Sequence, residues 1–214
     1  MNDIYKISLI ILMLTFLAAL TACGPKSLAV KEDHAFSVDI SGLELDKSEA
    51  PGIVYKRPGA PDLGAYDRFI IDPVRIVYDD PRMKELSPEQ VGRMMQYLRD
   101  SVINELRDAG YEVGTRSQAG TMRISFTISG LKAPTALPNV TAALAPFAVS
   151  VGEVTVEGIF REAVTDRIDA VAVNRARGAR VLNPRPWTTW GDVESALNIW
   201  AKGIREAVDK AHGR

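Results

Sequence analysis

Residues 87–110 read SPEQVGRMMQYLRDSVINELRDAG and contain the start, the apolar stripe and the end of one helix. The first four of them, residues 87–90, supply an N-cap serine, a proline for the first turn, an acid that favours the positive end of the helix dipole, and the glutamine of a capping box. Gly110 is placed to end the helix. Between these signals, apolar side chains recur at helical spacing: Val91, Met94, Met95, Leu98, Val102 and Leu106.

Strand patterns flank this helix on both sides. Residues 69–78 are rich in β-branched and aromatic side chains and predict a strand, in which Pro73 marks an edge or a bulge. Residues 111–113 and 121–131 predict strand after the helix, with a polar turn at 117–120 between them. A strand, a helix and a strand in this order predict a right-handed crossover, which places the two outer strands parallel.

The second half of the chain predicts a hairpin and a final helix. Residues 151–160 and 168–174 have strand patterns, and residues 162–166 form the turn between them. The final helix is expected over 189–211, because one face of it is apolar: Trp190, Val193, Leu197, Trp200, Ile204 and Val208. Two helices with one apolar face each predict an α+β fold, a two-layer α/β sandwich with both helices on one face of a four- to five-stranded mixed sheet.

The N-terminal region has the pattern of an export signal. After Lys6, residues 7–20 are almost wholly apolar, but fourteen residues rise only about 21 Å as a helix, short of the ~30 Å hydrocarbon core. Leu20, Thr21, Ala22 and Cys23 resemble a bacterial lipobox, in which the cysteine thiol is acylated before cleavage. The alternative is an ordinary secretory signal cleaved after Ala22. We expect a lipoprotein signal peptide over 1–22 and a lipid anchor on Cys23.

Residues 23–65 are expected to form a tether, up to about His34, and then an irregular arm with short strands that wraps onto a single α/β domain at 66–212. Residues 24–65 hold nine of the chain's 28 glycines and prolines, so no long helix or strand fits there. Gly24 follows the lipidated cysteine where an aspartate would retain the protein at the inner membrane. By resemblance to enteric sorting, this implies delivery to the outer membrane, facing the periplasm.

Composition excludes several classes of protein. The 26 Lys and Arg against 27 Asp and Glu give a charge of -1, which provides no basic field for nucleic acid. One cysteine excludes an internal disulfide, and with two histidines it cannot complete a Cys/His zinc site. The chain has no GxSxG, GxGxxG or GxxxxGK[ST] motif. His34 lies in the expected arm and His212 near the terminus, so we expect no catalytic residue, metal or cofactor.

Several residues and one segment are candidates for a binding or catalytic site. Arg175, Arg177, Arg180 and Arg185, with Trp187 beside them, fall in a predicted loop without acids and are candidates for an anion or partner contact. Glu153 and Glu157 share a strand face, but about 13 Å separates positions i and i+4, so a solvated sheet face is favoured over a glycosidase pair. The uncharged segment 133–148 is expected to be a lid, a docking site or a cover for a sheet edge.

The order of motifs resembles a family of proteobacterial lipoproteins known as domain of unknown function 3313. The resemblance rests on residues spread over the mature chain: 41–43, Tyr55, 66–74, Leu106, Tyr111, 151–157, 190–192 and 200–201. At the hairpin tip, where relatives often carry glycine, this chain has Val164, Thr165 and Asp166. The resemblance implies a lipid-anchored envelope protein without an established activity.

The expected function is a non-enzymatic accessory or adaptor domain held at the membrane by its N-terminal lipid, with an envelope protein as partner. The alternative is a binding protein for an anionic envelope component such as lipopolysaccharide, phospholipid or peptidoglycan. A third possibility is an envelope hydrolase that uses Glu153 or Glu157. The sequence leaves the oligomeric state open.

Overall fold

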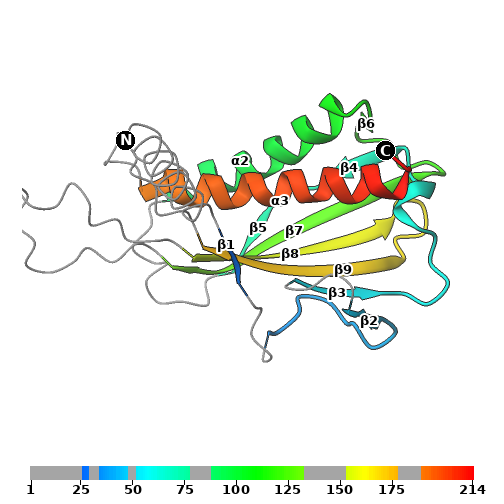
Figure 1. Ribbon diagram of the computed structural model, residues 1–214, viewed down its shortest axis with the longest axis horizontal. Helices are drawn as coiled ribbons and strands as arrows, with labels where there is room; N and C mark the ends of the chain where they lie inside the picture. The colour runs from blue at the N-terminus through cyan, green and yellow to red at the C-terminus, as the bar shows by residue number, and fades with distance from the viewer. Residues whose placement is uncertain (1–25, 29–33, 48–51, 78–87, 133–152, 178–188) are drawn as a thin grey trace, which may run out of the picture.

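The computed structural model describes residues 26–28, 34–47, 52–77, 88–132, 153–177 and 189–214 (Figure 1). Two long helices are α2 (Pro88–Asp108) and α3 (Thr189–Ala211), and a short 3-10 turn is η3 (Leu63–Ala65). The strands are β1 (Lys26–Leu28), β2 (Glu44–Asp46), β3 (Ile53–Lys56), β4 (Arg68–Ile71), β5 (Arg75–Ile76), β6 (Glu112–Val113), β7 (Thr121–Lys132), β8 (Glu153–Glu162) and β9 (Ile168–Arg177).

The described strands form one mixed sheet in the order β2-β3-β9-β8-β7-β4-β6, with β1 paired to β9 and β5 paired to β7. Strands β4 and β7, which precede and follow α2 in the chain, pair in parallel, which confirms the parallel arrangement predicted from the strand–helix–strand order. Strands β8 and β9 pair antiparallel through the predicted turn. The α+β fold with two helices is therefore confirmed.

The sheet has more strands than the four or five expected. Pro73 interrupts the predicted strand 69–78 and leaves β4 and β5 as separate short strands, because proline has no N–H for the ladder. The arm supplies two further strands, β2 and β3, and residues 26–28 supply a third, β1. Residues 26–28 were expected to belong to a tether, but as β1 they pair with β9.

Both helices cover the same face of the sheet, as the single apolar stripe of each predicts (Figure 1). The stripes meet the inward side chains of the central strands in one core, whose largest fully buried apolar side chains are Phe69, Leu98, Val102, Leu106, Met122, Ile124, Ile128 and Leu197. Trp200 is 6% exposed and belongs to this core, which confirms its place on the apolar stripe of α3.

The predicted end of α2 is also confirmed. Gly110 has φ 88°, a left-handed conformation that L side chains rarely adopt. Its N–H donates to the carbonyl oxygen of Arg107 at 2.9 Å, and the N–H of Tyr111 donates to that of Leu106 at 3.0 Å. These bonds satisfy the last carbonyl groups of the helix and turn the chain into β6.

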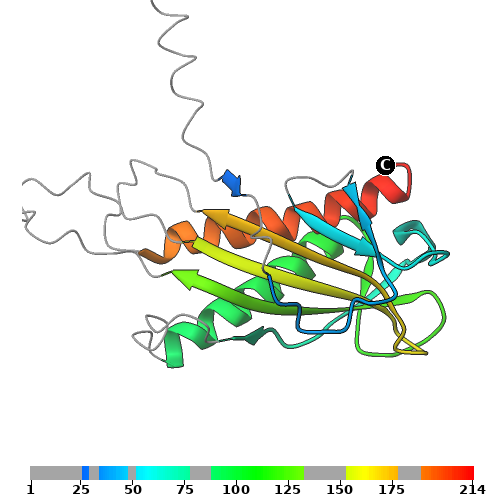
Figure 2. The ribbon, with the colours of Figure 1, turned by 90° about the horizontal axis from the view of Figure 1, so that it is seen from below.

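The face of the sheet opposite the helices is covered in part by the arm, which crosses it in Figure 2. Side chains of β8 and β9 on that face are buried although they lie outside the main core: Ile159, Val171 and Val173. His34 and Phe36 meet edge to face, and so do Phe36 and Tyr55, with ring centroids 5.1 and 5.4 Å apart. The arm is therefore packed onto the sheet.

Candidate functional site

The end of the sheet nearest the predicted lipid anchor carries a row of charged residues. In the strand register, Lys26 of β1 lies opposite Arg177 of β9, Arg177 lies opposite Glu153 of β8, and Glu153 lies opposite Lys132 of β7. Residues directly opposite one another on neighbouring strands share a face of the sheet. We call these four residues the terminal row; with three cations and one anion it is basic.

The terminal row lies close to the predicted lipidation residue along the chain. Lys26 follows Cys23 by three residues, and an extended chain spans at most about 3.6 Å per residue. Cys23 therefore lies within about 11 Å of Lys26, whatever the path between them. Cys23 and the lipobox residues Leu20, Thr21 and Ala22 fall outside the described residues.

The predicted arginine cluster is only partly described. Arg175 and Arg177 were expected in a loop, but β9 extends to Arg177, three residues beyond the predicted end of the strand. Residues 175–177 pair with β8 on one side and with β1 on the other. Arg180, Arg185 and Trp187 lie outside the described residues, as do the uncharged segment 133–148 and the lipoprotein signal.

Glu157 departs from the solvated sheet face that the sequence favoured. Its side chain is directed away from the helices, but the arm covers it and leaves it 2% exposed. Both carboxylate oxygens accept the backbone N–H of Ser37, at 3.2 and 3.1 Å, and the Ser37 hydroxyl donates to Oε1. His34 Nε2 lies 3.3 Å from Oε2. A buried carboxylate is thus paired with the arm rather than with water.

This serine, glutamate and histidine do not form a nucleophilic triad. In such a triad the imidazole stands between the hydroxyl and the carboxylate and takes the proton of the hydroxyl. Here the carboxylate of Glu157 stands in the middle and binds Ser37 and His34 separately. Glu153 and Glu157 do not lie opposite another carboxylate either, because Glu157 faces Thr127 and Val173 across the sheet. The arrangement fastens the arm.

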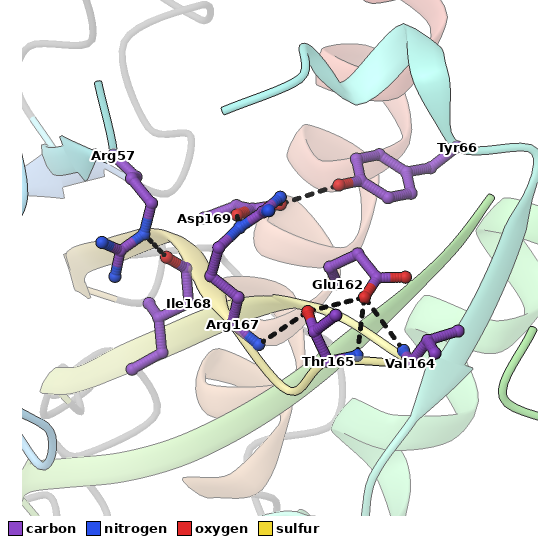
Figure 3. Close-up of polar contacts among 8 residues, drawn as sticks. All are labelled: Arg57, Tyr66, Glu162, Val164, Thr165, Arg167, Ile168 and Asp169. Atoms are coloured by element: carbon purple, nitrogen blue, oxygen red, sulfur yellow. Dashed lines mark hydrogen bonds and ion pairs between the residues drawn. The ribbon is translucent and has the colours of Figure 1, made fainter. Parts of the chain in front are cut away.

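A second polar cluster, in which Tyr66 and Asp169 are buried and Arg167 is exposed, lies at the turn between β8 and β9 (Figure 3). The hydroxyl of Tyr66 donates to Asp169 Oδ2 at 2.7 Å, and Arg167 donates to both oxygens of that carboxylate at 2.7 and 3.2 Å. Burial, followed by the hydrogen bond to Asp169, raises the pKa of Tyr66 to about 12. Arg57 reaches the same strand and donates from Nε to the carbonyl oxygen of Ile168 at 2.6 Å.

The turn itself is held by the carboxylate of Glu162. It accepts the N–H groups of Val164 and Thr165 at 3.1 and 2.7 Å and the hydroxyl of Thr165 at 2.7 Å (Figure 3). These bonds, with that of the Thr165 hydroxyl first, lower the pKa of Glu162. Asp166 has φ 58°, the left-handed conformation that glycine adopts more easily. The donors and acceptors in this cluster bind one another, so the cluster stabilises the hairpin.

The sequence alone predicted neither of these two polar clusters. The fold brings His34 and Ser37 to Glu157, which lies 123 and 120 positions further along the chain.

Within the described ranges, no group of three His, Cys, Asp or Glu side chains is arranged to hold a metal ion. No helix in the part of the chain that the structure describes is both long enough and apolar enough to cross a membrane.

Comparisons with known proteins give structural likeness at low identity. The PelC dodecamer from Paraburkholderia phytofirmans is 12% identical with a TM-score of 0.45, over 73% of this chain and 96% of that one. XCC0632 from Xanthomonas campestris is 10% identical with a TM-score of 0.41, over 69% and 88%. A minor lipoprotein from Acinetobacter baumannii is 9% identical with a TM-score of 0.36, over 70% and 95%.

No curated protein matches this chain. The model of a family described as a protein of unknown function, DUF3313, matches residues 32–204. That range covers most of the arm, the whole sheet from β2 onward and the greater part of α3. The chain therefore belongs to the DUF3313 family.

Proposed function

We propose that this protein is an envelope lipoprotein, anchored through Cys23 at the periplasmic face of the outer membrane, and that it acts there as a non-enzymatic accessory or adaptor domain. The observation that carries the proposal is the pairing of Lys26 with Arg177. It joins the chain immediately after the lipidation residue to the basic end of the sheet. The domain then meets the membrane with the terminal row and presents the rest of its surface to a partner.

The energetics favour this orientation. Buried acyl chains contribute about 0.8 kcal/mol per methylene, so two or three chains on Cys23 hold the protein firmly. Basic residues near an anionic surface add about 1 kcal/mol each, within a Debye length of ~8 Å at physiological salt. Lys26 follows Cys23 by only three residues, so the end of the sheet to which it pairs is held near the anchor, where its cations favour an anionic surface. The lipid supplies the affinity, and the charges set which end of the domain faces the bilayer.

The first experiment tests the anchor. Replacing Cys23 with Ser removes the only thiol of the chain. We expect the wild-type chain in the membrane fraction of cells and the Cys23→Ser chain outside it. Membrane fractionation of the variant equal to that of the wild type contradicts the anchor.

The second experiment tests the orientation in the Cys23→Ser chain, because without the lipid anchor the contribution of the charges to membrane binding can be measured. Lys26, Lys132 and Arg177 are replaced together by Gln, and binding to vesicles with 30% phosphatidylglycerol is measured by sedimentation. We expect the triple variant to bind several-fold more weakly at low salt. The matched control replaces three exposed cations elsewhere, Lys47, Arg116 and Lys210. If both triple variants lose the same amount of vesicle binding, the terminal row does not orient the domain toward the membrane.

The adaptor role is tested by its partner. Photo-crosslinking from exposed positions of the helices in intact cells, such as Gln96 of α2, is expected to capture a defined envelope protein. The second candidate function, binding of an anionic envelope component, is favoured by the arginines at the end of β9, Arg175 and Arg177, which begin the predicted arginine cluster. In that case the variant with Arg175, Arg177, Arg180 and Arg185 replaced by Ala loses affinity for purified lipopolysaccharide, whereas an adaptor keeps its cross-linked partner.

A further inference from the structure

Two arginines lie directly opposite each other on the face of the sheet that points away from the helices. Arg123 of β7 pairs in the register with Arg161 of β8. Met122 and Ile124, on either side of Arg123, belong to the core, so the arginines project from the other face. The β-carbons of directly opposite residues are about 5 Å apart, and like charges in such positions are destabilising. Local rules of this kind are broken at functional sites.

Neither guanidinium group is fully paired within the described part of the chain. Arg123 donates no hydrogen bond there: its Nε is buried and lies 3.7 Å from Asp72 Oδ1, whereas its two terminal nitrogens are not buried. Arg161 donates from Nη1 to Ser125 Oγ at 3.1 Å, and Ser125 donates to Asp72 Oδ2 at 2.7 Å. The Nε of Arg161 lies 3.8 Å from Asp166, whose side chain is 70% exposed. Both arginines therefore converge on Asp72 and Ser125 and keep N–H groups for a further acceptor.

An arginine and a carboxylate pair more completely at the nearby turn. Arg167 donates from Nε and Nη2 to the two oxygens of Asp169, at 2.7 and 3.2 Å. One guanidinium fork thus satisfies one carboxylate. Two neighbouring forks with unpaired N–H groups match a larger anion, with three terminal oxygens and about two negative charges. A phosphate monoester is such an anion.

Arg57 adds a third cation at the same end of this face. Tyr55 of β3 lies opposite Val171 of β9, and Arg57, two positions further on, has the same side of the sheet. Its Nε donates to the carbonyl oxygen of Ile168 at 2.6 Å (Figure 3), and Ile168 lies opposite Arg161. Arg57 makes no ion pair with the residues that the structure describes. The positive field around Arg161 is therefore strengthened from the side of β9.

We propose that Arg123 and Arg161 bind the phosphate group of a soluble phosphate monoester. The free N–H groups of the two forks donate to the phosphate oxygens, and the anion offsets the repulsion between the two arginines. Asp72 and Ser125 hold the forks from below, through the contacts at 3.7 and 3.1 Å. This site is separate from the terminal row and from the predicted cluster that begins at Arg175.

The place of the two arginines in the sheet favours a soluble ester over a lipid headgroup. Arg123 precedes Lys132 of the terminal row by nine positions of β7, which is about 30 Å at ~3.3 Å per residue. The terminal row faces the bilayer in the proposed function, and this step rests on that orientation. The arginines then lie several Debye lengths from the headgroups, so a ligand reaches them from the aqueous side.

Isothermal titration calorimetry of the full chain, in an uncharged detergent at low salt, tests the site with glycerol 3-phosphate. We expect saturable binding at least tenfold tighter than that of acetate, because a carboxylate occupies only one fork. Dihexanoyl phosphatidic acid, which carries the same phosphate on a lipid, is expected to bind no more tightly than glycerol 3-phosphate. Absence of saturable binding, or equal affinity for acetate, overturns the proposal. Tenfold tighter binding of the phosphatidic acid overturns the soluble source.

Arg123→Gln is the decisive variant. It breaks no hydrogen bond between described residues and removes the repulsion from Arg161, so it is expected to melt no lower than the wild type. Its affinity for glycerol 3-phosphate is expected to fall at least tenfold. The matched control is Arg75→Gln. Arg75 is exposed on the same face, opposite Thr127 and about 13 Å from Arg123 along β7, so this variant is expected to keep its affinity. Undiminished binding in Arg123→Gln, or equal losses in the two variants, overturns the proposal.

Arg161→Lys separates the planar fork from the charge. Lysine keeps the positive charge but cannot donate two parallel N–H groups. We expect several-fold weaker binding of glycerol 3-phosphate, and wild-type affinity in this variant overturns recognition by two forks. The variant with Lys26, Lys132 and Arg177 replaced by Gln is expected to bind glycerol 3-phosphate as the wild type does, whatever its effect on vesicle binding. Loss of the phosphate in that variant places the ligand on the terminal row and overturns the proposal.

Discussion

The carboxylate of Glu157 accepts the backbone N–H of Ser37 at 3.2 and 3.1 Å, across 120 positions of the sequence. This bond attaches the arm to strand β8 of the sheet. Glu157 is buried in the face of β8 opposite the helices, so its charge depends on the arm for compensation. The arm in turn depends on Glu157, because its residues 34–43 belong to no strand and make no strand-to-strand hydrogen bonds to the sheet.

Glu157→Ala is expected to release the arm. The variant leaves the Ser37 N–H without its acceptor, so we expect a loss of about 1–3 kcal/mol in the free energy of unfolding. Trypsin is also expected to cleave after the exposed Lys47 several-fold faster than in the wild type. The control is Glu112→Ala, which removes an exposed ion pair with Arg68 and is expected to cost less than about 1 kcal/mol. Unchanged proteolysis in Glu157→Ala contradicts the role of this bond.

Gly64→Ala is expected to disturb the contact between η3 and the end of α3. A β-carbon at position 64 collides with the carbonyl oxygen of Ala211, which is backbone and cannot turn aside. Overpacking of this kind costs about 1–3 kcal/mol. Thermal unfolding measures the loss. Gly114→Ala is the control, because its β-carbon meets no heavy atom within 4 Å and the melting temperature is expected to change little.

The elements predicted well from the sequence were those specified by local patterns. Helix α3 spans the predicted residues, and α2 ends where Gly110 requires it. The 3.6-residue period of each apolar stripe is a property of one segment, so one sequence suffices to read it. The parallel pairing of β4 with β7 followed from the handedness rule for crossovers rather than from any single residue.

The features that the sequence did not predict depend on distant partners. Alternation along β8 placed Glu157 on the face away from the helices but did not show that the arm covers that face. Short strands were expected in the arm, but their partners were not, because the pairing of β1 and β3 with β9 joins segments that are far apart in the chain. The pairing of the small residues Gly158 and Ala172 depends on the register of β8 with β9, which only the folded sheet fixes.

Tyr66→Phe is expected to remove an alkaline step in stability. The pKa of Tyr66 is raised to about 12 in the folded protein, against about 10 in the unfolded chain. Its contribution is therefore complete below pH 10 and is lost as the pH rises from 10 to 12, by about 2–3 kcal/mol. Denaturant unfolding at pH 8, 10 and 11 measures the step. The variant is expected to be less stable at pH 8 and to lose less between pH 8 and 11. A wild-type-like slope in Tyr66→Phe contradicts the assignment.

Asp209 gives the acid counterpart, because it links α3 to both α2 and the chain that follows α2. Its carboxylate accepts from the Tyr111 hydroxyl at 2.8 Å and from Arg205 Nη1 at 2.6 Å, while Arg205 Nε also donates to Glu105 of α2 at 2.9 Å. The bond from Tyr111, followed by that from Arg205, lowers the pKa of Asp209 despite the opposing effect of burial. The contribution of Asp209 to stability is thus present above its unfolded pKa of about 3.9 and is lost as the pH falls below that value.

Asp209→Asn is therefore expected to be less stable than the wild type at pH 7, with a difference that narrows as the pH falls from about 4 to 2.5, since both chains then carry a neutral side chain at this position. Urea unfolding at pH 7, 4 and 3 follows the difference. The exposed Asp108→Asn is the matched control for the loss of one negative charge nearby. If the deficit of Asp209→Asn stays constant down to pH 3, the carboxylate stabilises the helix pair by its shape and not by its charge. The bonds from Tyr111 and Arg205 then do not account for the acid sensitivity of the fold.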